Sequence, residues 1–364
     1  MKIFGIEQKE NNEPHKISWW GWVLLVILIL GTFIIYKQQH PSAETIGKAW
    51  SQDNMQRTEG MVFGTIYHIT YQADGDLQKG IDETLAQVDS SLSPFNKASV
   101  ITAINNGEDI EVNDMFTDVF MLAKEISKET DGAFDITVAP LVNLWGFGFK
   151  NMKQANADAI DSLRQYVGFN SVSLENGHVK KEHPETMLDC SAIAKGYGVD
   201  AVGKYLESQG VTNYMVEIGG EVRVRGCNPN GMLWSIGINK PIDDSLAVSG
   251  DIQQVLRITD QAMATSGNYR NFYIKDGKKY AHTIDPRTGY PVQHNILSST
   301  VVAKDCATAD AYATSFMVLG LDGAKEVLKR HPEIRAFFVC SKDDGTTEEW
   351  MSDNMKELIA PKNN

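Results

Sequence analysis

Residues 188–198 read LDCSAIAKGYG, and the interpretation of this stretch decides the fold class. Gly196, Gly198 and Ala201 form a G-x-G-x-x-A pattern, and Glu217 follows about twenty residues later, as in a dinucleotide-binding fingerprint. In a Rossmann fold, however, the first glycine lies in the tight turn directly after the strand. Here the expected strand ends near Cys190, and five residues intervene before the first glycine, Gly196. The stretch therefore does not predict a Rossmann fold.

The same stretch predicts a helix that begins close to a polar turn. Ser191 is a plausible N-cap, which places Lys195 and Gly196 inside the helix. The N-terminus of a helix attracts phosphate groups, and a lysine in its first turn adds positive charge. From this segment alone, a solvated helix lysine explains Lys195 equally well.

Periodicity on both sides predicts one large mixed α/β (α+β) domain over residues 58–355, without internal repeats. Alternation predicts a strand over residues 61–71, and helical spacing predicts helices over residues 77–92 and 116–126. Residues 216–226 predict a hairpin around a Gly-Gly turn. Residues 356–364 are expected to form a C-terminal tail.

Composition excludes several classes of protein. The 364 residues carry a formal net charge of -13 and the pI is about 5.1, which argues against nucleic acid as a partner. The four cysteines are too sparse for a disulfide scaffold and form no C-x-x-C pair, so a thiolate zinc site is not expected: Cys190, Cys227, Cys306 and Cys340.

The N-terminal region predicts a membrane anchor. Residues 17–36 are uncharged, and aromatic side chains mark both ends of the apolar run. We expect a cytoplasmic N-terminus over residues 1–18, a transmembrane helix over residues 19–36 and a linker over residues 37–57. Lysines before the span favour an extracytoplasmic catalytic domain. A cleaved signal peptide is the alternative, although no clean small-residue cleavage site follows.

Three further segments carry chemically useful side chains. Phe134 and Asp135 follow a helix end at which Gly132 serves as a C-cap, and an aromatic beside a carboxylate suits a heterocyclic ring. Asp310 and Thr314 are four residues apart in a predicted helix, so both project from one face and suit Mg²⁺. In isolation, an Asp–Thr hydrogen bond explains that pair as well.

His282 is the candidate proton carrier. It ends an apparent strand beside the turn Asp285-Pro286-Arg287-Thr288-Gly289. A histidine at such a position can shuttle a proton, since its charge changes near neutral pH. The turn itself needs Pro286 and Gly289, but it does not require the histidine.

Taken together, these segments resemble the ApbE family of FAD:protein FMN transferases. Eight motifs occur in the family's order between residues 61 and 321. They are Met61-x-x-Gly64-Thr65, Ser93-Pro94-Phe95-Asn96, Gly132-Ala133-Phe134-Asp135, Leu188-Asp189 through Ala194-Lys195-Gly196, Glu217-Ile218-Gly219-Gly220, Thr265-Ser266-Gly267, His282-x-x-Asp285-Pro286-x-Thr288-Gly289 and Asp310-Ala311-x-Ala313-Thr314. Each is weak alone, but eight in order are specific.

The resemblance implies a T-fold-like domain that takes FAD as substrate and Mg²⁺ as cofactor. It implies a flavin site made of Met61, Phe95, Ala133, Phe134, Asp135, Asp189, Lys195 and Ile284. It implies a metal held by Asp310, Thr314 and the backbone oxygen of Ala192. Two positions depart from the pattern. Phe95 stands where many members carry tyrosine, and Cys190 interrupts the second motif, where we interpret it as a small buried residue.

The expected activity is Mg²⁺-dependent transfer of FMN from FAD to a Thr or Ser hydroxyl of an acceptor protein, with release of AMP. Asp310 and His282 are the expected catalytic residues of this protein flavinylation, a post-translational modification. The alternatives are an FAD pyrophosphatase that gives FMN and AMP, and a non-catalytic exported flavin-binding protein. The resemblance suggests, as acceptor, an exported flavin-carrying subunit of a sodium-translocating NADH:quinone reductase or a related complex. The expected location is the cytoplasmic (inner) membrane, facing the periplasm.

Overall fold

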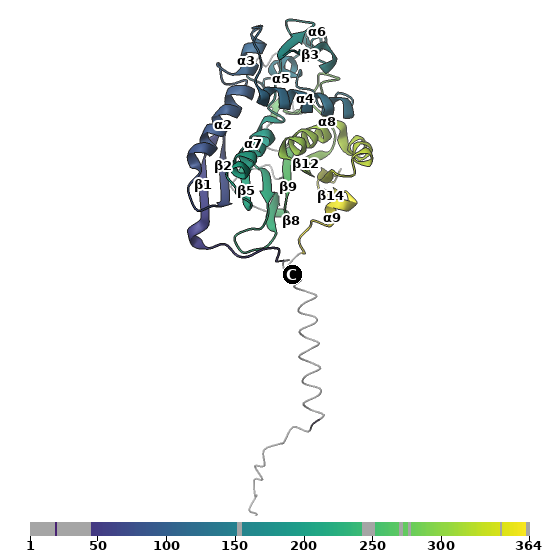
Figure 1. Ribbon diagram of the computed structural model, residues 1–364. Helices are drawn as coiled ribbons and strands as arrows, with labels where there is room; N and C mark the ends of the chain where they lie inside the picture. The colour runs from purple at the N-terminus through teal and green to yellow at the C-terminus, as the bar shows by residue number, and fades with distance from the viewer. Residues whose placement is uncertain are drawn as a thin grey trace, which may run out of the picture. The chain divides into compact units, whose positions relative to one another are not determined.

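The computed structural model describes residues 19, 45–150, 155–241, 252–268, 272–275, 278–342 and 344–361. Its centre is an eight-stranded sheet in the order β1-β2-β5-β6-β9-β12-β13-β14 (Figure 1). Every neighbouring pair in it is antiparallel, so the rejection of a parallel Rossmann sheet is confirmed. The strands are β1 (Met55–Val62), β2 (Thr65–Gln72), β5 (Tyr214–Ile218), β6 (Glu221–Arg225), β9 (Gln261–Gly267), β12 (Ile296–Ala303), β13 (Arg335–Ser341) and β14 (Thr347–Met351).

The single strand predicted over residues 61–71 is wrong. The chain forms a hairpin there, in which Val62 of β1 pairs with Thr65 of β2. Phe63 and Gly64 make the turn with φ values of 51° and 74°, and hairpin turns of two residues require such positive values. Alternation continues through the turn, which is why periodicity alone missed it.

Helices cover one face of the sheet. The predicted helices over residues 77–92 and 116–126 are confirmed as α2 (Gln78–Leu92) and α4 (Asp114–Glu129). α7 (Ala194–Ser208) contacts β5 and β6, and α8 (Cys306–Arg330) contacts β9 and β12 (Figure 1). The predicted hairpin over residues 216–226 is confirmed as β5 and β6.

Smaller elements complete the described fold. β7 (Trp234–Asn239) and β8 (Ile252–Ile258) form a hairpin whose apolar side chains pack with those of β6 and α9 (Asp353–Lys356). The others are η1 (Gln52–Asn54), α3 (Val100–Asn105), α5 (Ala139–Trp145), α6 (Ala157–Arg164), η2 (Phe169–Ser171), β3 (Val172–Glu175), β4 (His178–Lys181), β10 (Phe272–Lys275) and β11 (Lys278–Ala281).

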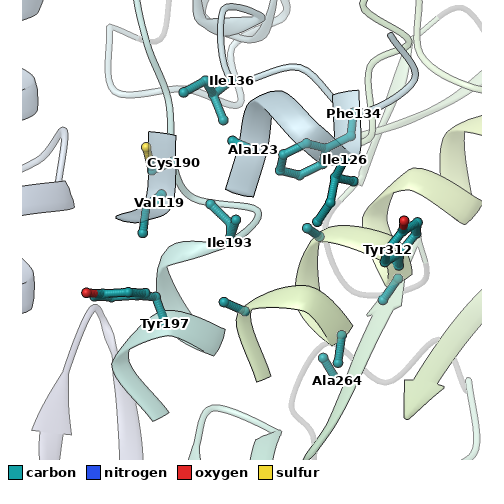
Figure 2. Close-up of a cluster of buried hydrophobic side chains, with 14 of the residues drawn as sticks. Val119, Ala123, Ile126, Phe134, Ile136, Cys190, Ile193, Tyr197, Ala264 and Tyr312 are labelled. Carbon is teal, nitrogen blue, oxygen red and sulfur yellow. The ribbon is translucent and has the colours of Figure 1, made fainter. Parts of the chain in front are cut away.

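The largest core lies between the helices and the sheet. Figure 2 shows Ala123 and Ile126 of α4 near Phe134, with Tyr197 and Tyr312 contributed by α7 and α8. All five side chains are buried. Cys190 belongs to the same core, as expected, and the four cysteines are buried free thiols.

α7 begins later than predicted. Its first residue is Ala194 and its N-cap position is Ile193, so the assignment of Ser191 as N-cap is wrong. The Asp189 side chain instead accepts hydrogen bonds from Ser191, which holds the turn before the helix. Residues 188–190 are not a strand either, because only Met187 makes a ladder bridge, to Val138. Lys195 lies inside the helix, as predicted.

α7 and α8 cross in close contact at Gly196. A Cβ atom at this position would lie 2.3 Å from the carbonyl oxygen of Cys306 in the first turn of α8. The Gly196 N–H donates to the Asp310 carboxylate at 3.0 Å. Farther along α7, buried Asp200 accepts the N–H groups of Cys306 and Ala307 at 2.8 and 2.9 Å. These contacts fix the two helices relative to each other.

Residues Thr45–Ala360 form one compact unit, which begins before the predicted domain boundary at residue 58. The second unit comprises Met1–Glu44 and Pro361–Asn364, and of the predicted span over residues 19–36 only Trp19 is among the described residues. Among the helices that the structure describes, none combines the length and the apolar character that crossing a membrane requires.

We predict that Gly196→Ala destabilises the protein, because the added methyl group meets backbone atoms of α8 that no rotamer change can clear. Overpacking of this kind costs about 1–3 kcal/mol. Urea unfolding followed by circular dichroism measures the loss. Gly75→Ala is the control, since nothing lies within 4 Å of its added Cβ. Equal stability of the two variants would contradict the close crossing.

Candidate active site

A cavity of about 400 Å³ opens where seven segments of the chain meet. Most of the residues predicted for the site line it: Phe95, Ala133, Phe134, Asp135, Asp189, Ala192, Lys195, His282, Ile284, Asp310 and Thr314. A larger cavity of about 630 Å³ lies elsewhere, among residues 46–54, 226–227 and 259–260, and none of the predicted site residues lines it. The smaller cavity is therefore the candidate active site.

Met61 does not line the cavity. Its side chain is 79% exposed on β1, where it faces Ile66 of the neighbouring strand. Phe95 is 69% exposed at the cavity mouth, with its ring centroid 6.4 Å from that of Phe149. Of the predicted flavin-site residues, Met61 is the one that is not among the residues lining the cavity.

The loop after α4 forms one wall. The C-cap of α4 is Thr130, so the prediction of Gly132 as the C-cap is wrong. Gly132 lies two residues beyond the cap, and its N–H donates to the carbonyl of Ser127 at 2.9 Å. Phe134 follows with its ring in the core, close to Ile126 (Figure 2). The aromatic side chain of this motif therefore shapes the wall mainly through core packing.

Asp135 is engaged by the protein itself. One carboxylate oxygen accepts the Thr137 N–H at 2.8 Å and the Thr137 hydroxyl at 2.6 Å, and the other accepts the Phe169 N–H at 2.8 Å. Burial raises the pKa of Asp135, although these donors oppose the shift. These three hydrogen bonds join the loop after α4 to Phe169, so Asp135 stabilises the cavity wall.

Asp189 and Ala192 lie on the turn that leads into α7. The Asp189 N–H donates to the carbonyl of Ile136 at 2.7 Å, which joins this turn to the loop after α4. The Asp189 side chain accepts the N–H and the hydroxyl of Ser191 at 2.8 and 2.5 Å. Burial raises the pKa of the Asp189 carboxyl. The turn thereby brings Ala192 to the cavity.

Lys195 is paired with a carboxylate that the sequence analysis did not select. Its ammonium lies 2.5 Å from Glu221, whose side chain is 3% exposed at the start of β6. Burial disfavours the ammonium, but Glu221 and Asp310 more than offset this, so the pKa of Lys195 is raised. Burial raises the pKa of Glu221 to about 7, opposed by Lys195 and assisted by Asp310. Lys195 is therefore not a solvated helix lysine.

Asp310 and Thr314 offer oxygen atoms from one face of α8. Asp310 is buried, and burial raises its pKa against the effects of Lys195 and the Gly196 N–H. Thr314 Oγ1 lies 3.0 Å from the hydroxyl of Ser266 on β9. A carboxylate, a hydroxyl and the Ala192 backbone are the hard oxygen donors that Mg²⁺ prefers. Among the described residues no cluster of three or more His, Cys, Asp or Glu side chains could hold a metal ion.

His282 follows β11, as expected, and lines the cavity. Its ring centroid is 6.4 Å from that of Phe147. The next residue, Thr283, donates its hydroxyl to the Asn268 side-chain oxygen at 2.7 Å, and the Gly289 N–H donates to the backbone carbonyl of Asp285 at 2.8 Å across the predicted turn. The turn therefore stabilises the strand end that carries His282.

The sequence analysis did not predict several residues that line the cavity. Among them are Glu221, Ser266 and Phe147. One feature of the sequence could have indicated Glu221. It is a charged residue at the start of an expected strand, directly after Gly219-Gly220, and charged residues are rarely buried in strands without a functional partner. Ser266 lay in a recognised motif, but nothing in the sequence placed it beside Thr314.

A family model described as "ApbE family" matches residues 63–338. The match covers the segments that line the cavity, from Phe95 to Val318. This chain belongs to the ApbE family, and the family resemblance seen in the sequence is confirmed. The mixed α/β fold expected from it is confirmed as well.

Relatives span most of the chain. A Vibrio cholerae protein named FAD:protein FMN transferase is 38% identical over 83% of this chain and 92% of its own length. An Escherichia coli protein of the same name is 34% identical, over 84% and 90%. The structure of the flavin transferase ApbE from Vibrio cholerae matches with a TM-score of 0.74 and 36% identity, over 84% of this chain and 99% of that chain. The Pseudomonas stutzeri flavinyl transferase ApbE matches with a TM-score of 0.76 and 31% identity, over 85% and 98%.

We predict that Asp135→Asn destabilises the protein, because an amide NH₂ would face the buried Phe169 N–H donor. A buried donor left without an acceptor costs about 1–3 kcal/mol. Thermal unfolding compares this variant with Asp131→Asn, an exposed position with φ of 50° that asparagine tolerates. If both variants melt like the parent, the carboxylate does not hold the wall.

Proposed function

We propose that the protein transfers the FMN half of FAD to a Thr or Ser hydroxyl of an acceptor protein and releases AMP. One observation carries the proposal. The cavity brings Lys195, Asp310, Thr314 and His282 together from α7, α8 and the end of β11, in a chain of the ApbE family. Positive charge, oxygen ligands and a proton carrier are what phosphoryl transfer needs.

The residues fit Mg²⁺, which Asp310, Thr314 and the Ala192 backbone oxygen would hold. When bound, the ion supplies positive charge that offsets the charge on pyrophosphate oxygens. Lys195 lies one residue inside α7, so its ammonium adds to the positive end of the helix dipole. The wall formed by Ala133, Phe134 and Ile284 is apolar and suits a flavin ring system.

The reaction balances without an oxidant or reductant. The acceptor's hydroxyl oxygen attacks the phosphorus of the FMN half and a new P–O bond forms. The P–O bond to the bridging oxygen breaks, and AMP leaves with that oxygen. His282 takes the hydroxyl proton as general base, since it lines the cavity and an imidazole is a suitable acceptor near neutral pH.

We further propose that residues 19–36 anchor the chain in the cytoplasmic membrane, with the catalytic domain on the periplasmic side. The support is the uncharged run over residues 17–36 and the aromatic residues at its ends. As acceptor we propose an exported flavin-carrying subunit of a sodium-translocating NADH:quinone reductase or a related complex.

The deciding assay incubates the protein with FAD, Mg²⁺ and such an acceptor subunit. We expect equal amounts of AMP and of acceptor that carries in-gel flavin fluorescence. The Asp310→Ala variant should remain folded and release no AMP. AMP without labelled acceptor would identify an FAD pyrophosphatase, and neither product would identify a flavin-binding protein.

We predict that His282→Ala slows single-turnover transfer by about a hundredfold or more, the usual scale for loss of a general base. FAD affinity should change little, because binding rests on the apolar wall and Lys195. Single-turnover transfer and FAD affinity, both measured for the parent and the variant, check these two expectations.

His178→Ala is the matched control, because that histidine pairs with Asp109 outside the cavity. A His282→Ala variant that binds FAD poorly, yet transfers at the parent rate when saturated, would assign the histidine to the turn alone.

A further inference from the structure

The packing of α7 on β6 includes a row of ion pairs. Arg223 bonds to Asp200 at 2.9 Å and to Glu207 at 3.0 Å, and Arg225 reaches Glu207 at 3.0 Å. Alternate residues of a strand share a face, so Glu221 presents its side chain to α7 as these arginines do. The row therefore continues to Glu221, where it reaches the cavity.

At this end of the row the charges are inverted. The strand supplies the carboxylate of Glu221 and the helix supplies the ammonium of Lys195, 2.5 Å apart. The second carboxylate oxygen of Glu221 is buried, and no described residue donates to it. A buried carboxylate with so few partners carries a large desolvation penalty. Its charge is also unfavourable near an anionic pyrophosphate, so Glu221 does not itself bind the phosphates.

Two buried carboxylates, those of Glu221 and Asp310, are possible ion-pair partners of Lys195. The buried Asp310 carboxylate lines the same cavity as Lys195 and Glu221. Among the described residues, however, the ion pair of Lys195 is with Glu221, and Asp310 accepts the Gly196 N–H. Lysine has a flexible four-carbon stem, so the partner that holds it decides where its charge lies.

We propose that Glu221 is a positioning residue that holds Lys195 against β6 and thereby keeps the Asp310 carboxylate available for a divalent cation. The inference deepens the proposed function and rests on its metal site. Without the Glu221 charge, Lys195 turns to the remaining carboxylate, because a charge-assisted hydrogen bond to Asp310 is stronger than one to a neutral amide. The ammonium then competes with the cation for the same oxygen atoms.

The test measures cation binding directly, by electron paramagnetic resonance titration of the full-length protein with Mn²⁺. Glu221→Gln should weaken Mn²⁺ binding about tenfold or more, the scale for losing a residue that orients a metal ligand. In the Lys195→Met background the same change should alter Mn²⁺ affinity by less than about twofold, because the competing ammonium is gone.

The double variant carries neither buried charge of the pair, so it is expected to fold at least as well as the parent. Arg225→Gln is the matched control: it removes an ion pair on the same face of the same strand, at a residue outside the cavity. Its Mn²⁺ affinity should equal that of the parent.

Three results would overturn the inference. They are parent-like Mn²⁺ binding by Glu221→Gln, an equal loss in the Lys195→Met background, and a parent protein that binds no Mn²⁺. The proposed function fails on a separate result: the parent protein binds Mn²⁺ but releases no AMP from FAD. The expected pattern in the variants would then still support the role of Glu221.

Discussion

The close crossing of α7 and α8 at Gly196 is the constraint on which the site depends. A Cβ atom there would lie 2.3 Å from a carbonyl oxygen of α8, so only glycine permits the contact. The crossing sets the first turn of α7 beside the face of α8 that carries Asp310 and Thr314. Lys195 is the neighbour of Gly196 in sequence, so its charge is placed by the same contact.

The site is costly in electrostatic terms. Asp310 and Glu221 are buried carboxylates around one lysine, and burial raises the pKa of both. Such an arrangement gives weak support to stability, since the desolvation of buried charges offsets their attraction. Clusters of this kind mark functional sites more often than structural ones. A cation at Asp310 would supply the positive charge that the protein side chains lack.

Two other predicted site residues make contacts that stabilise the fold around the cavity. Asp135 accepts three hydrogen bonds from Thr137 and Phe169, and Phe134 packs in the core. These contacts make the cavity wall rigid. A rigid wall matters for transfer, because reacting groups must be held in place before the chemistry begins.

The sequence by itself determined the helices around residues 77–92 and 116–126, the Gly-Gly hairpin, the family, and eleven of the residues that line the cavity. Local signals sufficed there, because periodicity, turn residues and motif order are properties of neighbouring residues. The hairpin at Phe63-Gly64 and the start of α7 at Ala194 were missed, since alternation and capping patterns do not fix where an element breaks.

Only the tertiary structure decided which side chains of the site contact each other. Glu221 and Lys195 are 2.5 Å apart, and Ser266 and Thr314 are 3.0 Å apart, yet each pair joins separate segments of the chain. The exposure of Met61, which does not line the cavity, could not be read from its motif either. Charge pairing and burial depend on which elements pack together, and the antiparallel order of the sheet and the crossing at Gly196 determine that packing.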